Sequence, residues 1–329
     1  MGEIRKDDTI GEPPKFFYKF KDYEYKNTCK DRVLSGIREL DYLTSGFEMG
    51  CITIWTGLTN VGKTTVLTML AKQTILQGNK VFFFNGEQTK DDFKNNLYKQ
   101  SVDKSDIYEI QYKESCVFDS FVNAKRVMEL DRLYGDNLII YNNEMPRDIG
   151  TLLYAMEECR RLYGVKVFIL DNFMQIDIQS DNVFQEQTVI MEKLRTFAVN
   201  KGIHIHLVAH PRKIDRYTNR LTLYDIAGSM NLANKAYNII SIMRVDTMDK
   251  SSNEYRKLAL DMLDGFFDIE QTSTALEVIK TKGKSCGLVG LQFDKVTRGF
   301  LPQPQIAGEI RDRLRLQYGG NAKGGSPFG

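Results

Sequence analysis

The sequence lacks long apolar runs and has no dominant charge. No segment approaches the roughly 18 consecutive apolar residues of a membrane-spanning helix, and residues 1–8 are charged where a secretory signal peptide would be apolar. With 45 Lys and Arg against 43 Asp and Glu, the net charge of +2 excludes a polybasic nucleic-acid coat and an acidic tail protein. We expect an intracellular protein without a membrane partner, cytoplasmic if bacterial or phage-encoded and in an organelle matrix if eukaryotic. Any contact with nucleic acid must be local.

Cysteine and proline are also scarce. The five cysteines are odd in number, widely spread and never in a C-x-x-C pair, which argues against a disulfide framework and against a zinc site. Seven prolines, with 42% hydrophobic and 27% charged residues, describe a folded globular protein rather than a disordered or collagen-like one. The length of 329 residues allows one large α/β domain with extensions, or about two domains.

Short runs of β-branched and aromatic residues alternate with longer segments of helical spacing. Several runs are apolar throughout, as strands covered on both faces must be. This alternation predicts an α/β fold with repeated βαβ units and a mostly parallel sheet. After residue 270 the pattern changes, which suggests antiparallel strands added at one edge near the C-terminus. We expect strands at 51–55, 81–84, 137–141, 167–170, 203–209, 238–243, 275–281 and 288–293, and helices that include 64–77, 148–163 and 185–200.

The ends of the chain differ in composition from its middle. We place one α/β domain at about 31–305. Residues 1–30 are rich in aromatic side chains and form a leader, for which packing on its own domain and docking on a neighbouring subunit both stay open. Five glycines within 319–329 favour a flexible tail, which we assign to 306–329.

A phosphate-binding loop is the strongest motif. Residues 57–64 read Gly-Leu-Thr-Asn-Val-Gly-Lys-Thr, a full match to G-x-x-x-x-G-K-[ST] between an apolar strand and a helical segment. Loop N–H groups would surround the β-phosphate of ATP or another nucleoside triphosphate. Lys63 would reach the β- and γ-phosphates, and the Thr64 hydroxyl would ligate Mg²⁺. The expected nucleotide-binding residues here are Gly57, Thr59, Asn60, Val61, Gly62, Lys63, Thr64 and Thr65.

Two carboxylates follow predicted strands. Asp171 ends an apolar strand and has the expected form of the second Mg²⁺-associated group. Glu87 comes just after the strand at 81–84. The carboxyl ends of parallel strands lie on one edge of a sheet, so Lys63, Glu87 and Asp171 could face one nucleotide. Glu87 is then the candidate that orients and deprotonates the attacking water.

All three histidines lie within 204–210. A metal site is not the leading interpretation, because no fourth ligand is evident nearby and alternation places His204 and His206 on one face of a strand. His210 is different because it sits at the carboxyl end of that strand, where it could sense the γ-phosphate.

A run of cations follows. A solvated loop is one explanation, and a loop that tracks a nucleic-acid backbone by charge is the functional one. The candidate DNA-binding residues are Arg212, Lys213, Arg216 and Arg220.

Together these segments resemble the motor domain of the DnaB-type hexameric replicative helicases, closest to Twinkle and the C-terminal domain of phage primase-helicases. The resemblance covers about residues 31–305. Residues 32–46 are similar to the segment that precedes the phosphate loop in that family, and 169–175 resemble its second acidic motif. Most specific is Val-Ala-His-Pro-Arg-Lys at 208–213, followed by Asp-Ile-Ala-Gly-Ser at 225–229.

The resemblance implies a RecA-like phosphate-loop NTPase core with helices on both faces of its sheet. It also implies a ring of six such domains, with ATP between subunits and 5′-to-3′ translocation on single-stranded DNA in the channel. Within this family pattern, Glu87 is the catalytic base, His210 couples phosphate state to the DNA loop, and 212–222 contacts DNA. Arg244 and Phe293 match positions that flank the nucleotide base.

Two departures from the family pattern stand out. The family commonly has Lys-x-Arg near the end, with the arginine reaching into the neighbour's active site, whereas this chain has Lys-Thr-Lys at 280–282. Lys282 lacks the planar fork of arginine and would stabilise the transition state less well. No primase-like region precedes residue 31, so we expect no primer synthesis from this chain. It is either a fragment of a longer protein or works with a separate primase or loader.

Two other functions stay open. A RecA-like ATPase of recombinase or signalling type would share the phosphate loop, Glu87 and Asp171. A ring-forming DNA-binding or assembly protein could use ATP with little turnover, and Lys282 favours it. The segments around His210 and 225–229 favour the helicase. ATP turnover, and its stimulation by DNA, separates the three.

Overall fold

The computed structural model describes residues 19–22, 31–113, 116, 118–178, 180–212, 220–226, 230–303 and 305–319. Contacts divide the chain into a short unit, Met1–Asp31, and a large unit, Arg32–Gly329. In the short unit, one 3-10 turn is described, Phe20–Asp22, and most of the predicted leader lies outside the described residues.

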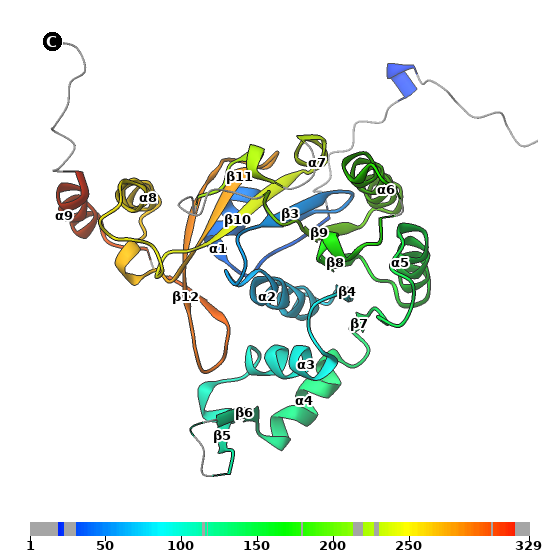
Figure 1. Cartoon of the computed structure of the whole chain (residues 1–329), viewed down its shortest axis with the longest axis horizontal. Helices are drawn as coiled ribbons and strands as arrows, with labels where there is room; N and C mark the ends of the chain where they lie inside the picture. Colours follow the sequence, from blue (N-terminus) through cyan, green and yellow to red (C-terminus); the bar gives the residue numbers. More distant parts are fainter. Residues whose placement is uncertain are drawn as a thin grey trace, which may run out of the picture. The chain divides into compact units, whose positions relative to one another are not determined.

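A nine-stranded sheet forms the centre of the large unit (Figure 1). Its order is β13-β12-β11-β10-β3-β9-β8-β4-β7. The strands from β10 to β7 pair in parallel, whereas β11, β12 and β13 are antiparallel additions at one edge. The bounds are β3 Ile52–Thr56, β4 Val81–Asn85, β7 Leu138–Ile140, β8 Val167–Asp171, β9 His204–Val208, β10 Asn238–Arg244, β11 Thr274–Lys280, β12 Gly287–Phe293 and β13 Phe300–Pro302. The predicted mostly parallel sheet with an antiparallel edge is confirmed.

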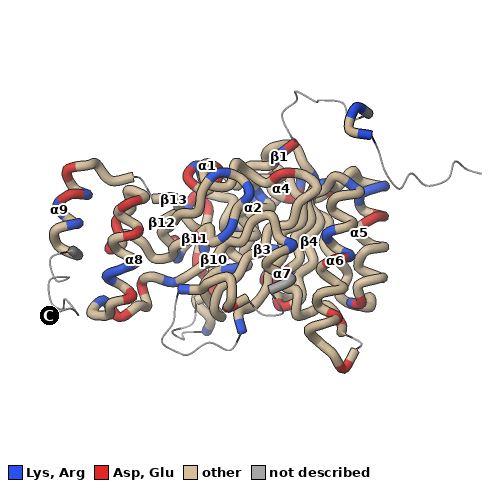
Figure 2. The backbone as a smooth tube through the Cα atoms, turned by 90° about the horizontal axis from the view of Figure 1, so that it is seen from above, with Lys and Arg blue, Asp and Glu red and all other residues tan. Residues whose placement is uncertain are grey.

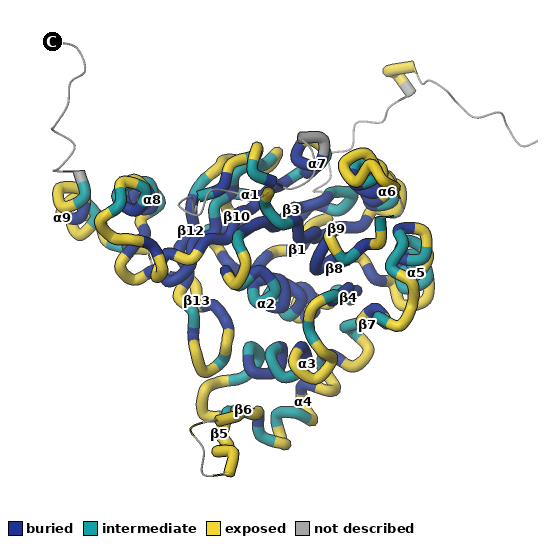
Figure 3. Tube along the Cα trace, in the orientation of Figure 1, coloured by how far each residue is buried: buried dark blue, intermediate teal, exposed yellow. Residues whose placement is uncertain are grey.

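Helices cover both faces of this sheet. Strand alternation divides the core between the faces: Phe82 and Phe84 of β4 pack with α5 and α6, while Phe83 packs on the α2 side. Figure 3 shows the central strands as an almost continuous buried layer. The helices are α1 Arg38–Thr44, α2 Lys63–Leu76, α3 Lys90–Lys99, α4 Ala124–Tyr134, α5 Ile149–Tyr163, α6 Val183–Lys201, α7 Met230–Lys235, α8 Asn253–Asp264 and α9 Gly308–Gly319.

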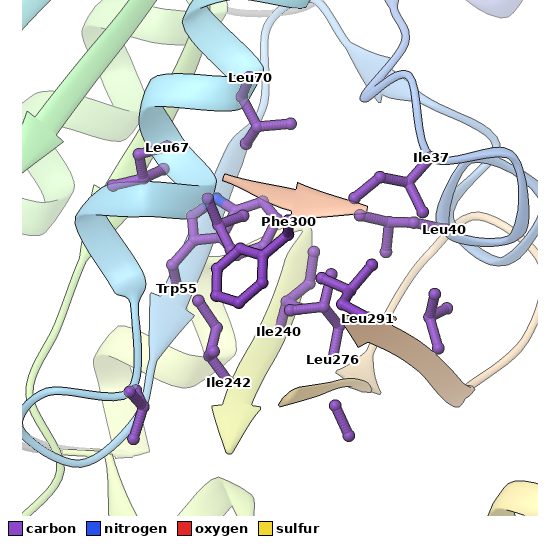
Figure 4. Packing of buried hydrophobic residues seen from close by; sticks show 14 of the residues in the cluster. Ile37, Leu40, Trp55, Leu67, Leu70, Ile240, Ile242, Leu276, Leu291 and Phe300 are labelled. Atoms are coloured by element: carbon purple, nitrogen blue, oxygen red, sulfur yellow. The ribbon is translucent and has the colours of Figure 1, made fainter. Parts of the chain in front are cut away.

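The antiparallel edge packs against α2. Phe300 of β13 is 5% exposed and lies among Trp55, Ile240 and Leu291, beside α2 (Figure 4). Its backbone N–H donates to Met69 of α2. Burying a side chain of this size contributes about 1.5–3 kcal/mol, so β13 is fixed against the helix that begins at the phosphate loop.

Some elements were not predicted from the sequence. Strands β5 (Ile107–Gln111) and β6 (Phe118–Val122) form a hairpin outside the main sheet, and β1 (Arg32–Val33) pairs with β2 (Phe47–Glu48). In Figure 3 the β5–β6 hairpin is mostly exposed. No helix in the described ranges combines the length and apolar character that crossing a bilayer requires.

The predicted flexible tail is wrong for residues 308–319, which form α9. This helix packs on α8, where Leu314 is buried and the Arg311 guanidinium lies 4.5 Å from the centre of the Phe266 ring. Figure 2 shows basic and acidic segments close together on α8 and α9, and Arg315 pairs with Asp264 between them. The glycines near the end of the chain had favoured a flexible tail over this helix. Residues 320–329 lie outside the described residues.

Candidate functional site

The phosphate loop joins β3 to α2 in a backbone path that needs two glycines. At Gly57 an added Cβ would collide with the Ile242 carbonyl oxygen of β10. At Gly62 it would lie 2.7 Å from the Phe300 ring, and φ is +94°, a region that favours glycine. The loop is therefore seated between the neighbouring strand and β13, and α2 begins directly after it.

Lys63 lies at the amino end of α2 with its amine turned back into the loop. Its Nζ donates to the carbonyl oxygens of Gly57 at 3.0 Å and Leu58 at 2.7 Å. Burial lowers the pKa of this amine, while the carboxylates of Asp171 and Glu87 oppose the shift. Its loop acceptors are neutral carbonyls, so a phosphate oxygen would be a stronger partner.

Thr64 and Asp171 form an oxygen-rich pair under the loop. The Thr64 hydroxyl donates to Asp171 Oδ2 at 2.6 Å, and Asp171 is only 3% exposed. Burial raises the pKa of Asp171 to about 6. Within the described ranges no group of three or more His, Cys, Asp or Glu is placed to hold a metal alone. The pair suits Mg²⁺, which typically takes one or two carboxylates and completes its shell with phosphate oxygens and water.

Asn172 connects Glu87 to His210. Its side-chain Nδ2 donates to Glu87 Oε1 and lies 3.0 Å from His210 Nε2, while the latter is 3.7 Å from Glu87 Oε1. Burial lowers the pKa of His210, and Lys63 adds to this effect, so the ring is neutral at pH 7 and its Nε2 can accept from the amide. Asn172 is 2% exposed, and its Oδ1 accepts from the Met174 N–H. The amide is thus held between the candidate base and the candidate sensor.

The turn that carries Glu87 is also fixed. Asn85 Oδ1 accepts from the N–H groups of Glu87 at 3.3 Å and Gln88 at 3.1 Å. Gly86 has no room for a side chain, because an added Cβ would lie 2.5 Å from Gln175. Glu87 itself keeps an exposed carboxylate at the mouth of the site.

These groups line one cavity of about 500 Å³ at the carboxyl ends of the parallel strands. The cavity collects most of the residues expected from the sequence: Thr59, Asn60, Val61, Gly62, Lys63, Thr64, Thr65, Glu87, Asp171, His210, Arg244 and Phe293. Its wall also includes residues that no sequence motif had indicated: Gln88, Asp246, Ser273, Thr274, Lys295, Arg298 and Phe300. Gly57 belongs to the phosphate loop but does not line the cavity.

The comparisons with known proteins agree with this geometry. Residues 33–301 match the family described as the DnaB-like helicase C terminal domain. The chain belongs to this family. The match covers most of the large unit, including the phosphate loop, the carboxylates and the antiparallel edge.

Solved structures support the same fold. A DnaB-like replicative helicase, in a structure that describes its interactions with primase, has 18% identity and a TM-score of 0.65 over 83% of this chain. This chain spans 62% of that helicase chain. A second solved structure, of an ATPase domain, has 17% identity and a TM-score of 0.64, with 83% of this chain and 91% of that domain covered. A KaiC-like protein from Pyrococcus horikoshii has 15% identity and a TM-score of 0.54, with 84% of this chain and 100% of that chain covered. The RecA-like fold is confirmed.

Arg244 and Phe293, which this DnaB-like domain places in the cavity wall, have local partners. The Arg244 guanidinium binds both carboxylate oxygens of Asp246, at 2.9 and 2.7 Å, and this hydrogen bonding raises the Arg244 pKa. The Phe293 ring lies 5.4 Å from the Phe300 ring in a T-shaped arrangement. Base contact by these two residues stays a prediction.

The four candidate DNA-binding residues of the DnaB-like domain differ in their surroundings. Arg212 is exposed, and its backbone N–H donates to the Asp225 carbonyl at 2.6 Å. Lys213 and Arg216 lie outside the described residues. The Arg220 guanidinium pairs with Glu277 at 2.7 Å and with Asp261. Those carboxylates balance its charge, so we predict that Arg220 anchors the chain here and contributes little to DNA binding.

Lys282 lies far from its own cavity. In β10, Ile239 faces Lys280 and Arg244 faces Thr274, so Lys282 follows the end of β11 that is opposite to the cavity. Lys280 donates to the Ala233 and Asn234 carbonyls. Any contact of Lys282 with nucleotide would therefore have to be made in a neighbouring subunit.

His204 and His206 are core residues. His204 Nδ1 lies 2.7 Å from the Glu48 carbonyl and its Nε2 lies 3.1 Å from Thr53 Oγ1. His206 Nδ1 accepts from the Trp55 indole at 3.2 Å. Burial lowers the pKa of both rings, so they pack as neutral groups.

Proposed function

We propose that this DnaB-like domain is the ATP-hydrolysing motor of a replicative DNA helicase that moves along single-stranded DNA. The observation that carries the proposal is the convergence of Lys63, the Thr64–Asp171 pair and the Glu87–Asn172–His210 chain on one cavity. A phosphate site, a metal site, a base and a sensor are the parts that hydrolysis coupled to movement requires.

ATP binding begins with an exchange at Lys63. Its amine leaves the Gly57 and Leu58 carbonyls and binds the β- and γ-phosphate oxygens, while loop N–H groups surround the β-phosphate. Thr64 and Asp171 would hold Mg²⁺, which would supply positive charge next to the phosphates. Above its pKa of about 6, Asp171 is a carboxylate, which is the form that would bind the ion.

Glu87 then orients a water molecule and accepts its proton during attack on the γ-phosphate. Asn172 holds the Glu87 carboxylate through one amide hydrogen and can hold neutral His210 through the other. When the γ-phosphate leaves, Glu87 loses the group that it faces. The hydrogen bonds through Asn172 transmit the resulting movement of Glu87 to His210.

The segment after His210 carries that change towards DNA. Pro211 forms an antiparallel β-bridge with Ile226, and the Arg212 backbone N–H donates to the Asp225 carbonyl. The beginning of the segment is therefore held against residues 225–226. Arg212, Lys213 and Arg216 bind the DNA backbone by charge, which is recognition without sequence preference. His210 thus links phosphate state to the grip on the strand.

The working assembly is a homo-hexamer with 5′-to-3′ movement, in which Lys282 of one subunit reaches the cavity of the next. A separate primase or loader is a partner, in keeping with the primase interactions described for one similar helicase.

The test is ATP hydrolysis by the purified chain, with Mg²⁺ and with or without single-stranded DNA. We expect strong stimulation by DNA and loss of turnover, with nucleotide binding kept, in Glu87→Gln. Glu144→Gln, which replaces an exposed glutamate outside the cavity, is the matched control. Glu87-dependent turnover that DNA does not alter would favour a RecA-like ATPase of another type. ATP binding without turnover would favour an assembly protein.

A further inference from the structure

The turn between β12 and β13 places two cations in the wall of the nucleotide cavity. Lys295 and Arg298 line the same cavity as Lys63, Thr64 and Glu87. Across the described ranges, neither Lys295 nor Arg298 has a side-chain ion pair. The third cation near them in the wall, Arg244, is already bound to a carboxylate.

This turn is held in place by contacts on several sides. Asp294 is buried, and its Oδ1 accepts from the N–H groups of Val296 at 2.9 Å and Thr297 at 3.2 Å. Lys104 binds the other carboxylate oxygen at 2.5 Å. The Arg298 carbonyl accepts from Gln100 Nε2 at 3.3 Å. The backbone that carries the two cations is thus fixed, while their side chains remain exposed.

Positive charge at this place exceeds the negative charge that could balance it. Lys99, at the end of α3, is 5% exposed and has no ion pair in the described part of the chain. Burial lowers the pKa of Lys99, and the charge of Arg298 lowers it further, although Asp119 opposes the shift. An anion bound at the turn would relieve this repulsion, and a nucleotide in the cavity brings several negative charges.

We propose that Lys295 and Arg298 bind the phosphates of the nucleotide held by their own subunit. The proposal rests on the proposed function, because it takes the cavity to be the nucleotide site. Arg298 presents a planar fork of N–H donors, the geometry that matches phosphate oxygens. At the position where the family commonly has an arginine from the neighbour, this chain has Lys282. Arg298 supplies a guanidinium to the phosphates from the same chain.

The experiment measures equilibrium binding of Mg-ATP, in a Glu87→Gln background that prevents turnover. We expect Arg298→Ala to weaken binding about tenfold or more, because it removes charge-assisted hydrogen bonds. Lys295→Ala should weaken binding less, because a lysine is a single point of charge. Arg313→Ala and Lys257→Ala remove exposed cations from α9 and α8, outside the cavity, and should leave affinity unchanged.

A second variant guards against damage to the turn. Arg298 has φ +55°, and alanine is less tolerant of this conformation than asparagine. Arg298→Asn should therefore melt like the parent protein and still lose ATP affinity. The loss should be equal for ATP, GTP, CTP and UTP, because they share their phosphates, and it should shrink as salt rises.

Three outcomes would overturn the inference: unchanged ATP affinity in Arg298→Asn, a loss confined to one base, or an equal loss of single-stranded DNA binding without nucleotide. If the Glu87→Gln parent bound no nucleoside triphosphate at all, the proposed function itself would fail, so the two failures are distinguishable.

Discussion

Replacing Asp171 with asparagine should stabilise the folded domain while removing its activity. Burial raises the pKa of the Asp171 carboxyl from 3.8 to about 6, and Glu87 adds to the shift, whereas the Thr64 hydroxyl and Lys63 oppose it. The folded state therefore binds this proton more tightly than the unfolded chain does. Stability from this group is full below pH 3.8 and is lost as the pH rises through about 6. A shift of about two pKa units corresponds to roughly 3 kcal/mol.

The assay is urea unfolding of wild type and Asp171→Asn in EDTA, without nucleotide. We expect the variant to gain about 3 kcal/mol near pH 7.5 and about half of that near pH 5, where the folded wild type is already largely protonated. The asparagine oxygen can still accept from Thr64. Asp181→Asn, at an exposed aspartate, is the matched control and should gain nothing. An equal gain at both pH values, or lower stability of Asp171→Asn near pH 7.5, would contradict the raised pKa of Asp171.

Three further predictions concern other residues of the fold and site. Lys63→Ala should abolish ATP binding in equilibrium dialysis, because it removes the cation that reaches the phosphates. Gly62→Ala should lower the melting temperature far more than Gly78→Ala: both have positive φ, but an added Cβ has open space only at Gly78, where nothing lies within 4 Å. Arg220→Ala should lower stability by about 1–3 kcal/mol in urea unfolding with little effect on single-stranded DNA affinity, whereas Arg212→Ala should weaken DNA binding with a smaller salt slope. If Arg220→Ala weakened DNA binding, Arg220 would contact DNA after all.

The parallel sheet and the phosphate loop were predictable because their signals are local. The strand at 81–84 is apolar throughout because it is covered on both faces. The glycines of 57–64 are needed because the backbone of a phosphate loop leaves no room for a Cβ at these positions. The carboxyl-edge rule then brought Glu87 and Asp171 together without knowledge of tertiary contacts. Their roles in catalysis stay predictions.

The remaining parts of the site depend on contacts between distant segments. Asn172 follows Asp171 directly, but its link to Glu87 and His210 exists only once β4, β8 and β9 are neighbours. Arg298 enters the cavity because β13 folds back along β12. The sequence indicated antiparallel strands at this edge but gave no range for β13. Arg220 was grouped with the loop cations because its carboxylate partners lie 41 and 57 residues away along the chain.

The α9 helix and the β5–β6 hairpin were not predicted from the sequence. The flexible tail expected from the terminal glycines included residues 308–319, where Ile310, Leu314 and Tyr318 follow one another at a spacing of four residues, as on one face of a helix. The β5–β6 hairpin was missed because its strands are mostly exposed and therefore lack the apolar runs used to find the others.

The separation of Lys282 from the cavity restricts the symmetry of any assembly in which Lys282 contacts the cavity of a neighbouring subunit. The two lie at opposite ends of the sheet strands, so a contact in which Lys282 completes the next cavity joins two different surfaces. A two-fold dimer could make that contact only if one interface covered both ends of the strands. Head-to-tail repetition makes it with a smaller interface, and the rotation between neighbours then decides between a closed ring and an open helical filament. In an open filament, one terminal subunit would keep a cavity that no neighbour completes.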